Sequence, residues 1–250
     1  MRLAVPADQP ALSALWAACF EEPREVAEFF FSRLWEEIAV FTNDNVTTMA
    51  TAMPVFWQGK KAAYLYAVAT APEMRGRGLC RQLLAWAENF LREQGASYTL
   101  LVPASPSLFS FYGKLGYETV FFSETRTYAA QKGLAVPIRP VPSETYAALR
   151  DRFGPEGSVA YPLPLLALQE SSGPLLEVSG LGCAAVEKAE EGFIARELLS
   201  PNPAAAAAAL CSYLGVPSLK ARIPGDQPFG MAKSLDGSPL IRSYLGLAFE

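Results

Sequence analysis

An arginine- and glycine-rich turn divides two contrasting patterns within residues 64–95, and this contrast most constrains the fold. Residues 64–70 are rich in β-forming side chains and carry no charge, and Pro72 follows them, which is typical of a buried strand that ends there. From Leu79 onward, apolar residues recur at the spacing of one helical face. The stretch therefore predicts a strand, a turn at residues 75–78 and a helix.

The turn has the chemistry of a phosphate-binding site. The first amides of a helix have no partner within the helix, and the helix dipole leaves positive partial charge there. Gly76 and Gly78 allow a ligand to approach the backbone, and Arg75 and Arg77 add planar cationic donors that suit phosphate oxygens. A solvated basic turn that needs glycine only for its shape is the alternative. The position between strand and helix favours phosphate binding.

The pattern Arg75-x-x-Gly78-x-Cys80 resembles the signature of the GCN5-related N-acetyltransferase (GNAT) superfamily, whose last position is glycine or alanine. In that superfamily the turn holds the pyrophosphate of acetyl-coenzyme A (acetyl-CoA), and the preceding strand pairs with the pantetheine arm. Acetyl-CoA is therefore the implied cosubstrate. The residues that the resemblance assigns to it are Val68, Ala69, Thr70, Arg75, Gly76, Arg77, Gly78, Leu79, Cys80, Arg81 and Ser105.

Cys80 departs from the superfamily pattern, and two interpretations are open. A thiol at a helix N-terminus beside arginines could have a lowered pKa and form a mixed disulfide with coenzyme A. The simpler interpretation, which we favour, is a small residue where a small residue is needed. Ser105 stands where many members of the superfamily carry asparagine.

A second block, residues 111–117, reads Phe-Tyr-Gly-Lys-Leu-Gly-Tyr and is similar to the Phe-Tyr-x-Lys-Leu-Gly-Phe block of the same superfamily. In many members that tyrosine protonates the departing thiolate of coenzyme A, so the resemblance gives Tyr112 this catalytic role. The alternative is a buried aromatic helix end in which Tyr112 only packs. Two motifs in the correct order favour the catalytic interpretation.

The resemblance implies an α+β fold of the GNAT type, with a central, twisted, mostly antiparallel sheet flanked by helices. Residues 1–131 contain the expected order of strand, two helices, three strands, helix, strand, helix and two closing strands, at 117–122 and 124–130. A proline-rich segment follows. Residues 132–250 are similar to the second half of tandem, Eis-like acetyltransferases, which implies a smaller, degenerate GNAT-like domain without a coenzyme site.

The second half contains a faint echo of the first. A glycine, a strand and a proline follow a helix at Gly95…Pro103 and again at Gly215…Pro224. The alanine-rich segment before Gly215 predicts a helix with a thin face that packs closely on a sheet. Residues 153–174 contain four prolines and predict a loop, and residues 244–249 predict a closing strand.

The two early helices border the acceptor pocket in the GNAT fold. The implied pocket residues are Phe20, Glu25, Glu28 and Phe29, and the alternative for each is a solvated glutamate or a core phenylalanine. The general base is not identified by the sequence. The candidates are Glu25, Glu28, Glu118, a water chain and the chain terminus. In Eis-like proteins the terminal carboxylate enters the site, which makes Glu250 the terminal candidate.

Composition excludes several other classes of site. The chain has no histidine, so Ser-His-Asp triads and histidine-ligated metals are excluded, and its four cysteines are far apart, so no metal site is expected. A net charge of −4 gives no basic footprint for nucleic acid. The absence of a signal peptide and of a long apolar run predicts a cytoplasmic protein without a membrane span.

Together these features predict an acetyl-CoA-dependent N-acetyltransferase that transfers an acetyl group to a primary amine by direct attack on the thioester. The acceptor is a small amine or a protein amine, and the sequence allows a homo-oligomer. The alternative is a non-catalytic acyl-CoA-binding sensor or regulatory protein.

Overall fold

The computed structural model describes residues 1–131, 136–189 and 192–248, which form two compact units. Unit 1 comprises Met1–Glu118 and Met231–Leu240, and unit 2 comprises Thr119–Gly230 and Ile241–Glu250. This division differs from the predicted boundary at residue 131 in two places. The strand that begins at Glu118 counts with unit 2, and a short segment near the C-terminus counts with unit 1. Glu250 lies outside the described residues.

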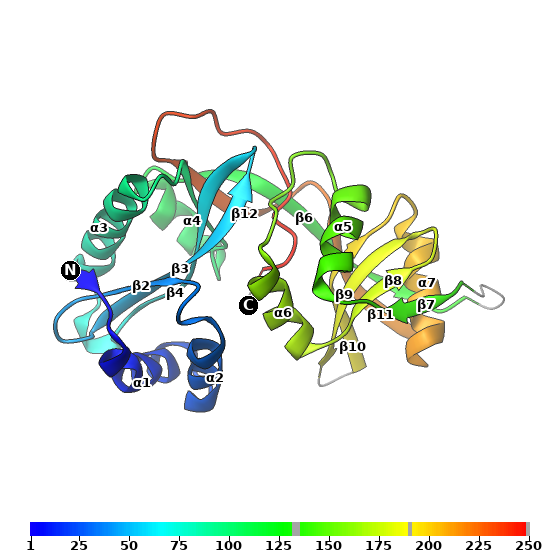
Figure 1. Ribbon diagram of the computed structural model, residues 1–250, viewed down its shortest axis with the longest axis horizontal. Coiled ribbons are helices and arrows are strands. Elements are labelled where there is room, and N and C mark those ends of the chain that lie inside the picture. Colours follow the sequence, from blue (N-terminus) through cyan, green and yellow to red (C-terminus); the bar gives the residue numbers. More distant parts are fainter. Residues whose placement is uncertain (132–135, 190–191, 249–250) are drawn as a thin grey trace. The chain divides into compact units, whose positions relative to one another are not determined.

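Unit 1 follows the predicted order of elements from its first strand to its last helix (Figure 1). The elements are β1 (Arg2–Leu3), α1 (Gln9–Phe20), α2 (Arg24–Leu34), β2 (Ala39–Thr42), β3 (Thr48–Trp57), β4 (Lys60–Thr70), α3 (Leu79–Glu93), β5 (Tyr98–Leu101) and α4 (Pro106–Gly113). Short 3-10 turns at Pro6–Asp8 and Pro72–Met74 precede α1 and α3.

The sheet of unit 1 has the order β1-β2-β3-β4-β5-β12, and only β4 and β5 are parallel. The alternation of side chains along β4 decides which helices cover which face. Leu65 packs with Leu83 and Ala87 of α3. Tyr66, the next residue, packs its ring against Trp16 of α1 and Phe30 of α2. The sheet therefore has α3 on one face and the α1–α2 pair on the other.

The last strand of this sheet comes from far along the sequence. β12 (Gln227–Ser234) pairs antiparallel with β5, with Met231 opposite Leu101 and Ser234 opposite Tyr98. We call residues 231–240 the return segment. Beyond β12, Pro239 accepts a hydrogen bond from the Tyr98 hydroxyl at 3.3 Å. The return segment therefore belongs to unit 1 through both backbone and side-chain contacts.

Unit 2 repeats the same plan with its own elements. They are β6 (Glu118–Ala129), β7 (Ile138–Pro140), α5 (Ser143–Phe153), α6 (Leu163–Ser172), β8 (Leu175–Val178), β9 (Gly182–Ala189), β10 (Gly192–Leu199), α7 (Pro203–Leu214) and β11 (Ser218–Pro224). The sheet order is β6-β11-β10-β9-β8-β7, and β10 and β11 are its parallel pair. The α7 crossover joins these two strands as α3 joins β4 and β5, which confirms a second, GNAT-like half.

The two halves exchange their sixth strands. After α4, the chain leaves unit 1 and forms β6, which pairs antiparallel with β11 of unit 2 from Ser123 to Ala129. After β11, the chain leaves unit 2 and forms β12, which pairs antiparallel with β5 of unit 1. β6, which follows the first half in the sequence, therefore borders the parallel pair of unit 2. β12, which follows the second half, borders the parallel pair of unit 1.

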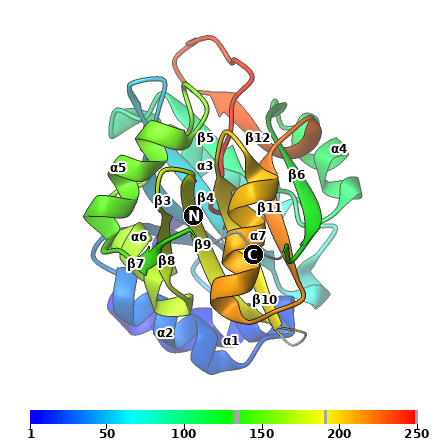
Figure 2. The ribbon, with the colours of Figure 1, turned by 90° about the vertical axis from the view of Figure 1, so that its right-hand side faces the viewer.

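The alanine-rich helix α7 packs on the sheet of unit 2 as the sequence predicts. Ala206, Ala207 and Ala209 are buried in one cluster with Val186, Ala195 and Leu198 of the strands. Figure 2 shows α7 lying along the strands of this sheet, and Figure 1 shows α5 and α6 on the other face. Methyl side chains let the helix approach closely, which explains the run of alanines.

Three predictions about secondary structure are wrong. α6 forms where a loop was expected, because Pro164 occupies the first turn of a helix, where proline fits. β6 is one strand instead of a closing pair, because β12 provides the second strand beside β5. Residues 244–248 form no strand. The buried Tyr161 hydroxyl donates to the carbonyls of Leu245 and Leu247, in place of a strand partner.

A buried ion pair holds the interior of unit 2. Arg150 on α5 donates from Nε and Nη2 to the two carboxylate oxygens of Glu197 on β10, at 2.7 and 3.0 Å, and the Tyr146 hydroxyl donates to the same carboxylate. Burial alone would lower the pKa of Arg150, but Glu197 outweighs it and holds the pKa above its usual value.

Among the described residues, no helix is long and apolar enough to cross a bilayer.

We expect Arg150→Met to destabilise the protein strongly, because it leaves the fully buried Glu197 carboxylate without its cation. Removing one partner of a buried pair costs about 3–5 kcal/mol. The matched control, Arg139→Met, breaks an exposed pair with Glu177 and costs less than about 1 kcal/mol. Urea denaturation measures the free energy of unfolding of both variants. Equal losses of stability would contradict a structural role for the buried Arg150–Glu197 pair.

Candidate active site

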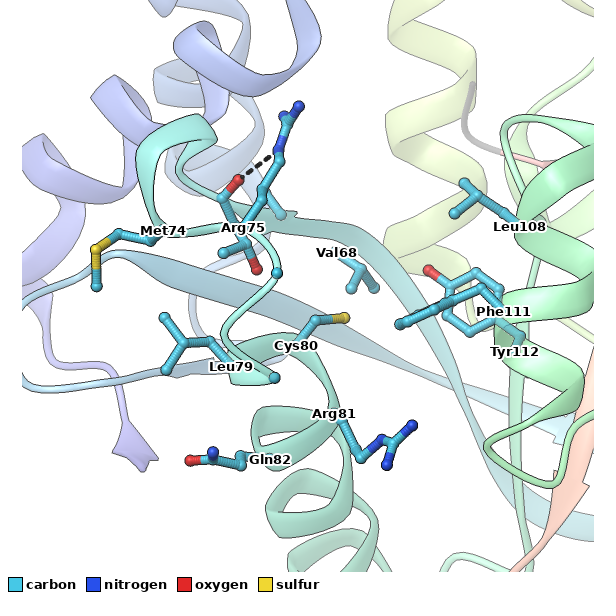
Figure 3. A pocket seen from close by; sticks show the side chains of 14 residues that line it. Val68, Met74, Arg75, Leu79, Cys80, Arg81, Gln82, Leu108, Phe111 and Tyr112 are labelled. Atoms are coloured by element: carbon cyan, nitrogen blue, oxygen red, sulfur yellow. Dashed lines mark hydrogen bonds between the residues drawn. The ribbon is translucent and has the colours of Figure 1, made fainter.

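A cavity of about 680 Å³ lies in unit 1, where the end of β4, the start of α3 and one face of α4 meet (Figure 3). Its lining residues are Val68, Ala69, Thr70, Met74, Arg75, Gly76, Gly78, Leu79, Cys80, Arg81, Gln82, Leu108, Phe111 and Tyr112. The volume lies within the range of about 300–1,000 Å³ that is usual for small-molecule sites.

The separation of β4 and β5 provides one wall of the cavity. These strands pair only at three positions, from Ala62 to Tyr64 on β4. Beyond Tyr64, β4 continues to Thr70, still paired with β3 on its other edge. The edge that faces away from β3 therefore has no ladder partner among the described residues. Its backbone groups are available to an extended ligand, as a strand edge is to a peptide.

A β-bulge changes the direction of β4 at the cavity. Met49 pairs with Ala69 and Thr51 pairs with Tyr66, so two residues of β4 oppose one residue of β3. The first of these two, Ala67, has φ of 50°, a left-handed conformation that costs free energy for a residue other than glycine. The bulge therefore places strained backbone directly before Val68, which lines the cavity.

The turn before α3 presents unsatisfied backbone donors to the cavity. Gly78 occupies the N-cap position with φ of 77° and provides no side-chain cap, and Gly76 has φ of 75°. The first intrahelical bond is from the Gln82 amide to the Gly78 carbonyl, at 3.1 Å. The amides of residues 79–81 thus have no acceptor within the helix. In unit 2, by contrast, the Asn202 side chain caps α7 by accepting from the Ala205 amide.

The two arginines of the turn differ in their positions. Arg75 donates from Nε to the Thr70 carbonyl at 3.1 Å, which fixes its guanidinium at the end of β4, and it lines the cavity. Arg77 donates to the Glu73 carbonyl at 3.3 Å and does not line the cavity. Ser105 precedes α4, also outside the cavity, with its hydroxyl 3.0 Å from that of Ser107. Of the residues assigned to the cosubstrate, the structure therefore places all but Arg77 and Ser105 around the cavity.

Tyr112 reaches the cavity from the last turn of α4. Only 7% of its surface is exposed, and its hydroxyl forms no hydrogen bond with the described residues. Figure 3 shows this hydroxyl directed from α4 toward the side of Val68. Burial, with a smaller effect of Cys80, raises the pKa of Tyr112 well above its usual value. The hydroxyl is therefore protonated at neutral pH and can donate a proton.

Cys80 lines the cavity, but it is not an activated thiol. Burial raises the pKa of Cys80 to about 11. The alternative of a lowered pKa is therefore wrong, because removal of the thiol from water disfavours its charged form. At neutral pH the side chain is a neutral, small wall of the cavity.

The predicted acceptor residues lie on α1 and α2 and do not line the cavity. Glu28 pairs with Arg24 at 3.0 Å, and the Arg33 guanidinium lies 5.3 Å from the centroid of the Phe29 ring. Glu25 is exposed, and so is Phe20 at the end of α1. α1 itself reaches the end of β4, where the Cys19 thiol donates to the Thr70 carbonyl at 3.4 Å.

Sequence reasoning missed two groups of residues near the site. Met74, Gln82, Leu108 and Phe111 line the cavity without having been predicted, and the spacing of Leu108 from Phe111 and from Tyr112 along α4 was a usable signal. Glu88 lies on the buried face of α3, where a charged residue among apolar ones was the signal.

Within the described part of the chain, no three histidine, cysteine or acidic side chains are grouped so that they could hold a metal ion.

Comparison with known proteins agrees with the fold and the motifs. The model of the acetyltransferase (GNAT) domain family matches residues 1–120. No curated protein matches the sequence.

Several solved structures have a similar fold over almost the whole chain. A probable N-acyltransferase from Enterococcus faecalis is 20% identical, with a TM-score of 0.74 over 94% of this chain and 72% of its own. A GCN5-related N-acetyltransferase from Kribbella flavida is 16% identical, with a TM-score of 0.71 over 94% and 71%. Eis1 from Mycobacterium abscessus is 16% identical, with a TM-score of 0.63 over 94% and 73%.

The family match covers the half of the chain that holds the cavity, the uncapped helix and Tyr112. The structural matches extend through the second half. Residues 1–120 therefore match the acetyltransferase (GNAT) domain family, and the fold of nearly the whole chain is similar to that of these solved structures.

Proposed function

We propose that this protein is an acetyl-CoA-dependent N-acetyltransferase that transfers the acetyl group to a primary amine by direct attack on the thioester. The family match over residues 1–120 supports acyl transfer in general. The observation that carries the specific proposal is the cavity. It joins an open strand edge, an uncapped helix N-terminus and an unpartnered tyrosine hydroxyl, each from a different element.

The residues present fit acetyl-CoA in its three chemically different parts. The uncapped amides at the start of α3, with Arg75 beside them, suit a pyrophosphate. The free edge of β4 from Val68 to Thr70 suits the amides of the pantetheine arm. The apolar side chains of Leu108 and Phe111 suit its methylene groups.

When bound, acetyl-CoA supplies the activated thioester, so the protein needs to orient groups and move protons. The turn at residues 76–78 fixes the phosphate end. The bulge at Ala67 orients the Val68 amide, which stabilises negative charge on the thioester oxygen. Tyr112, whose hydroxyl is protonated at neutral pH and lies at the cavity, would deliver its proton to the departing sulfur.

Deprotonation of the acceptor amine needs a base from outside the cavity lining. None of the fourteen residues that line the cavity carries a carboxylate. We propose that a carboxylate acts through water, with the terminal carboxylate of Glu250 as a candidate, and that Phe20, Glu25, Glu28 and Phe29 contribute to acceptor binding. The same observation keeps a non-catalytic acyl-CoA sensor as the second candidate function.

We predict that Gly78→Asp weakens acetyl-CoA binding while the fold survives. The new carboxylate has room, since only the Gln82 amide group lies within 4 Å, and it repels phosphate at the helix N-terminus. We expect a loss of affinity of about tenfold or more in calorimetry. Gly95→Asp is the matched control, because Gly95 also has a positive φ and open space but lies at the other end of α3. Equal affinity in the two variants would reject the phosphate site.

We predict that Tyr112→Phe lowers kcat by about a hundredfold or more, with little change in acetyl-CoA affinity, because it removes only the proton donor. Steady-state kinetics with an accepted amine measures the first effect, and calorimetry measures the second. Tyr98→Phe removes another buried hydroxyl of unit 1, outside the cavity, and is the control. A kcat for Tyr112→Phe that matches this control would reject the catalytic role.

A further inference from the structure

Glu88 is a carboxylate on the buried face of α3. Its neighbours on that face are Leu84, Ala87 and Leu91, and only 8% of its surface is exposed. Burial of a charge is unfavourable unless partners replace the lost water. The contacts of Glu88 therefore indicate what this position does.

Both oxygens of Glu88 are hydrogen-bonded by side chains from other elements. The Tyr117 hydroxyl donates to Oε1 at 2.9 Å, and Lys233 Nζ donates to Oε2 at 2.5 Å. Thr99 on β5 in turn donates to the Tyr117 hydroxyl at 3.0 Å. Burial and then the charge of Glu88 raise the pKa of Tyr117, so its hydroxyl stays protonated and donates. We call Glu88, Thr99, Tyr117 and Lys233 the carboxylate network.

Tyr117 connects this network to the candidate proton donor. Its ring packs edge-on against the Tyr112 ring, with the centroids 5.8 Å apart, and its amide donates to the Tyr112 carbonyl at 3.1 Å. The Tyr112 hydroxyl has no hydrogen-bond partner among the described residues. The direction of that hydroxyl therefore depends on how its ring is packed, chiefly by Tyr117 and the adjacent Phe111.

The cation of the network comes from the return segment. Lys233 lies opposite Thr99 in the β12–β5 pairing, which places both side chains beside Tyr117. The stem of Lys233 passes Gly116, where a Cβ atom would lie 3.5 Å from its Cε atom. Gly116 also has φ of 90°, so a side chain there would be strained. The turn after α4 thus lies in contact with the stem of this lysine.

From these contacts we propose that Glu88, Tyr117 and Lys233 are positioning residues for Tyr112, so that the return segment holds the proton donor in its catalytic orientation. The proposal rests on the proposed function, because it takes Tyr112 as the proton donor. Strand exchange then has a consequence for activity. A residue near the C-terminus, in a segment that lies between the two stretches of unit 2 in the sequence, orients a group at the active site of unit 1.

The first test compares variants that disturb the network in different ways. Tyr117→Phe keeps the ring and the Lys233–Glu88 pair and removes only the hydroxyl, so the fold is retained. Lys233→Met removes the cation and leaves the stem. We expect each to lower kcat by about tenfold or more through misplacement of Tyr112, with unchanged KM for acetyl-CoA.

Lys60→Met is the matched control for the return segment. It removes contacts of Lys60 with Ser238 and Asp236 in the same segment but does not touch Glu88. We expect its kcat to be normal. If Lys60→Met lowers kcat as much as Lys233→Met, docking of the segment is responsible and the positioning role is overturned.

A double-mutant cycle with Tyr112→Phe separates positioning from general damage. We expect Tyr117→Phe to have no further effect on kcat in the Tyr112→Phe background, because the group that it orients is already gone. Equal effects in both backgrounds would overturn the proposal. If Tyr112→Phe alone leaves kcat unchanged, the proposed proton donor is wrong, which is a distinct result.

A readout without turnover completes the test. In protein with 13C-labelled tyrosine rings, the Tyr112 signal is assigned by its loss in Tyr112→Phe. We expect that signal to shift and broaden in Lys233→Met and to stay in place in Lys60→Met. An unchanged Tyr112 signal in Lys233→Met would overturn the proposal, whether or not an acceptor amine is known.

Discussion

The short parallel pairing of β4 with β5 is the constraint on which the site depends. The two strands are paired only from Ala62 to Tyr64 on β4, and the bulge at Ala67 changes the course of β4 beyond them. Without this separation, β5 would occupy the free edge of β4, and the start of α3 would face a closed sheet. The cavity exists because a strand edge and a helix N-terminus, both normally satisfied within a fold, are left open at one place.

The two halves share one architecture but differ at the start of the crossover helix. In unit 1 this helix start borders the cavity. Both halves contain a parallel pair joined by a crossover helix, α3 in unit 1 and α7 in unit 2. The turn before α3 has two glycines of positive φ and no side-chain cap, whereas Asn202 caps α7. The difference in binding chemistry thus arises in the few residues before each helix.

Local chemistry made much of the first half predictable from the sequence. The strand, turn and helix around Gly78 and the helix that ends near Tyr112 depend on nearby residues, and the resemblance to the GNAT superfamily rests on them. A closing strand at residues 229–233 was predictable from the sequence and is part of β12, but its pairing with β5 was not, because that pairing joins residues more than a hundred positions apart. The pKa of Cys80 depends on burial, which the sequence does not show.

The central claim is acyl transfer from acetyl-CoA to an amine, and thiol release tests it most directly. Purified protein is mixed with acetyl-CoA and a panel of small amines, polyamines and lysine peptides, and free coenzyme A is measured with a thiol reagent. The account predicts release that depends on both the protein and at least one amine and that saturates with acetyl-CoA. Saturable binding of acetyl-CoA without amine-dependent release from any member of the panel would contradict it and favour a sensor.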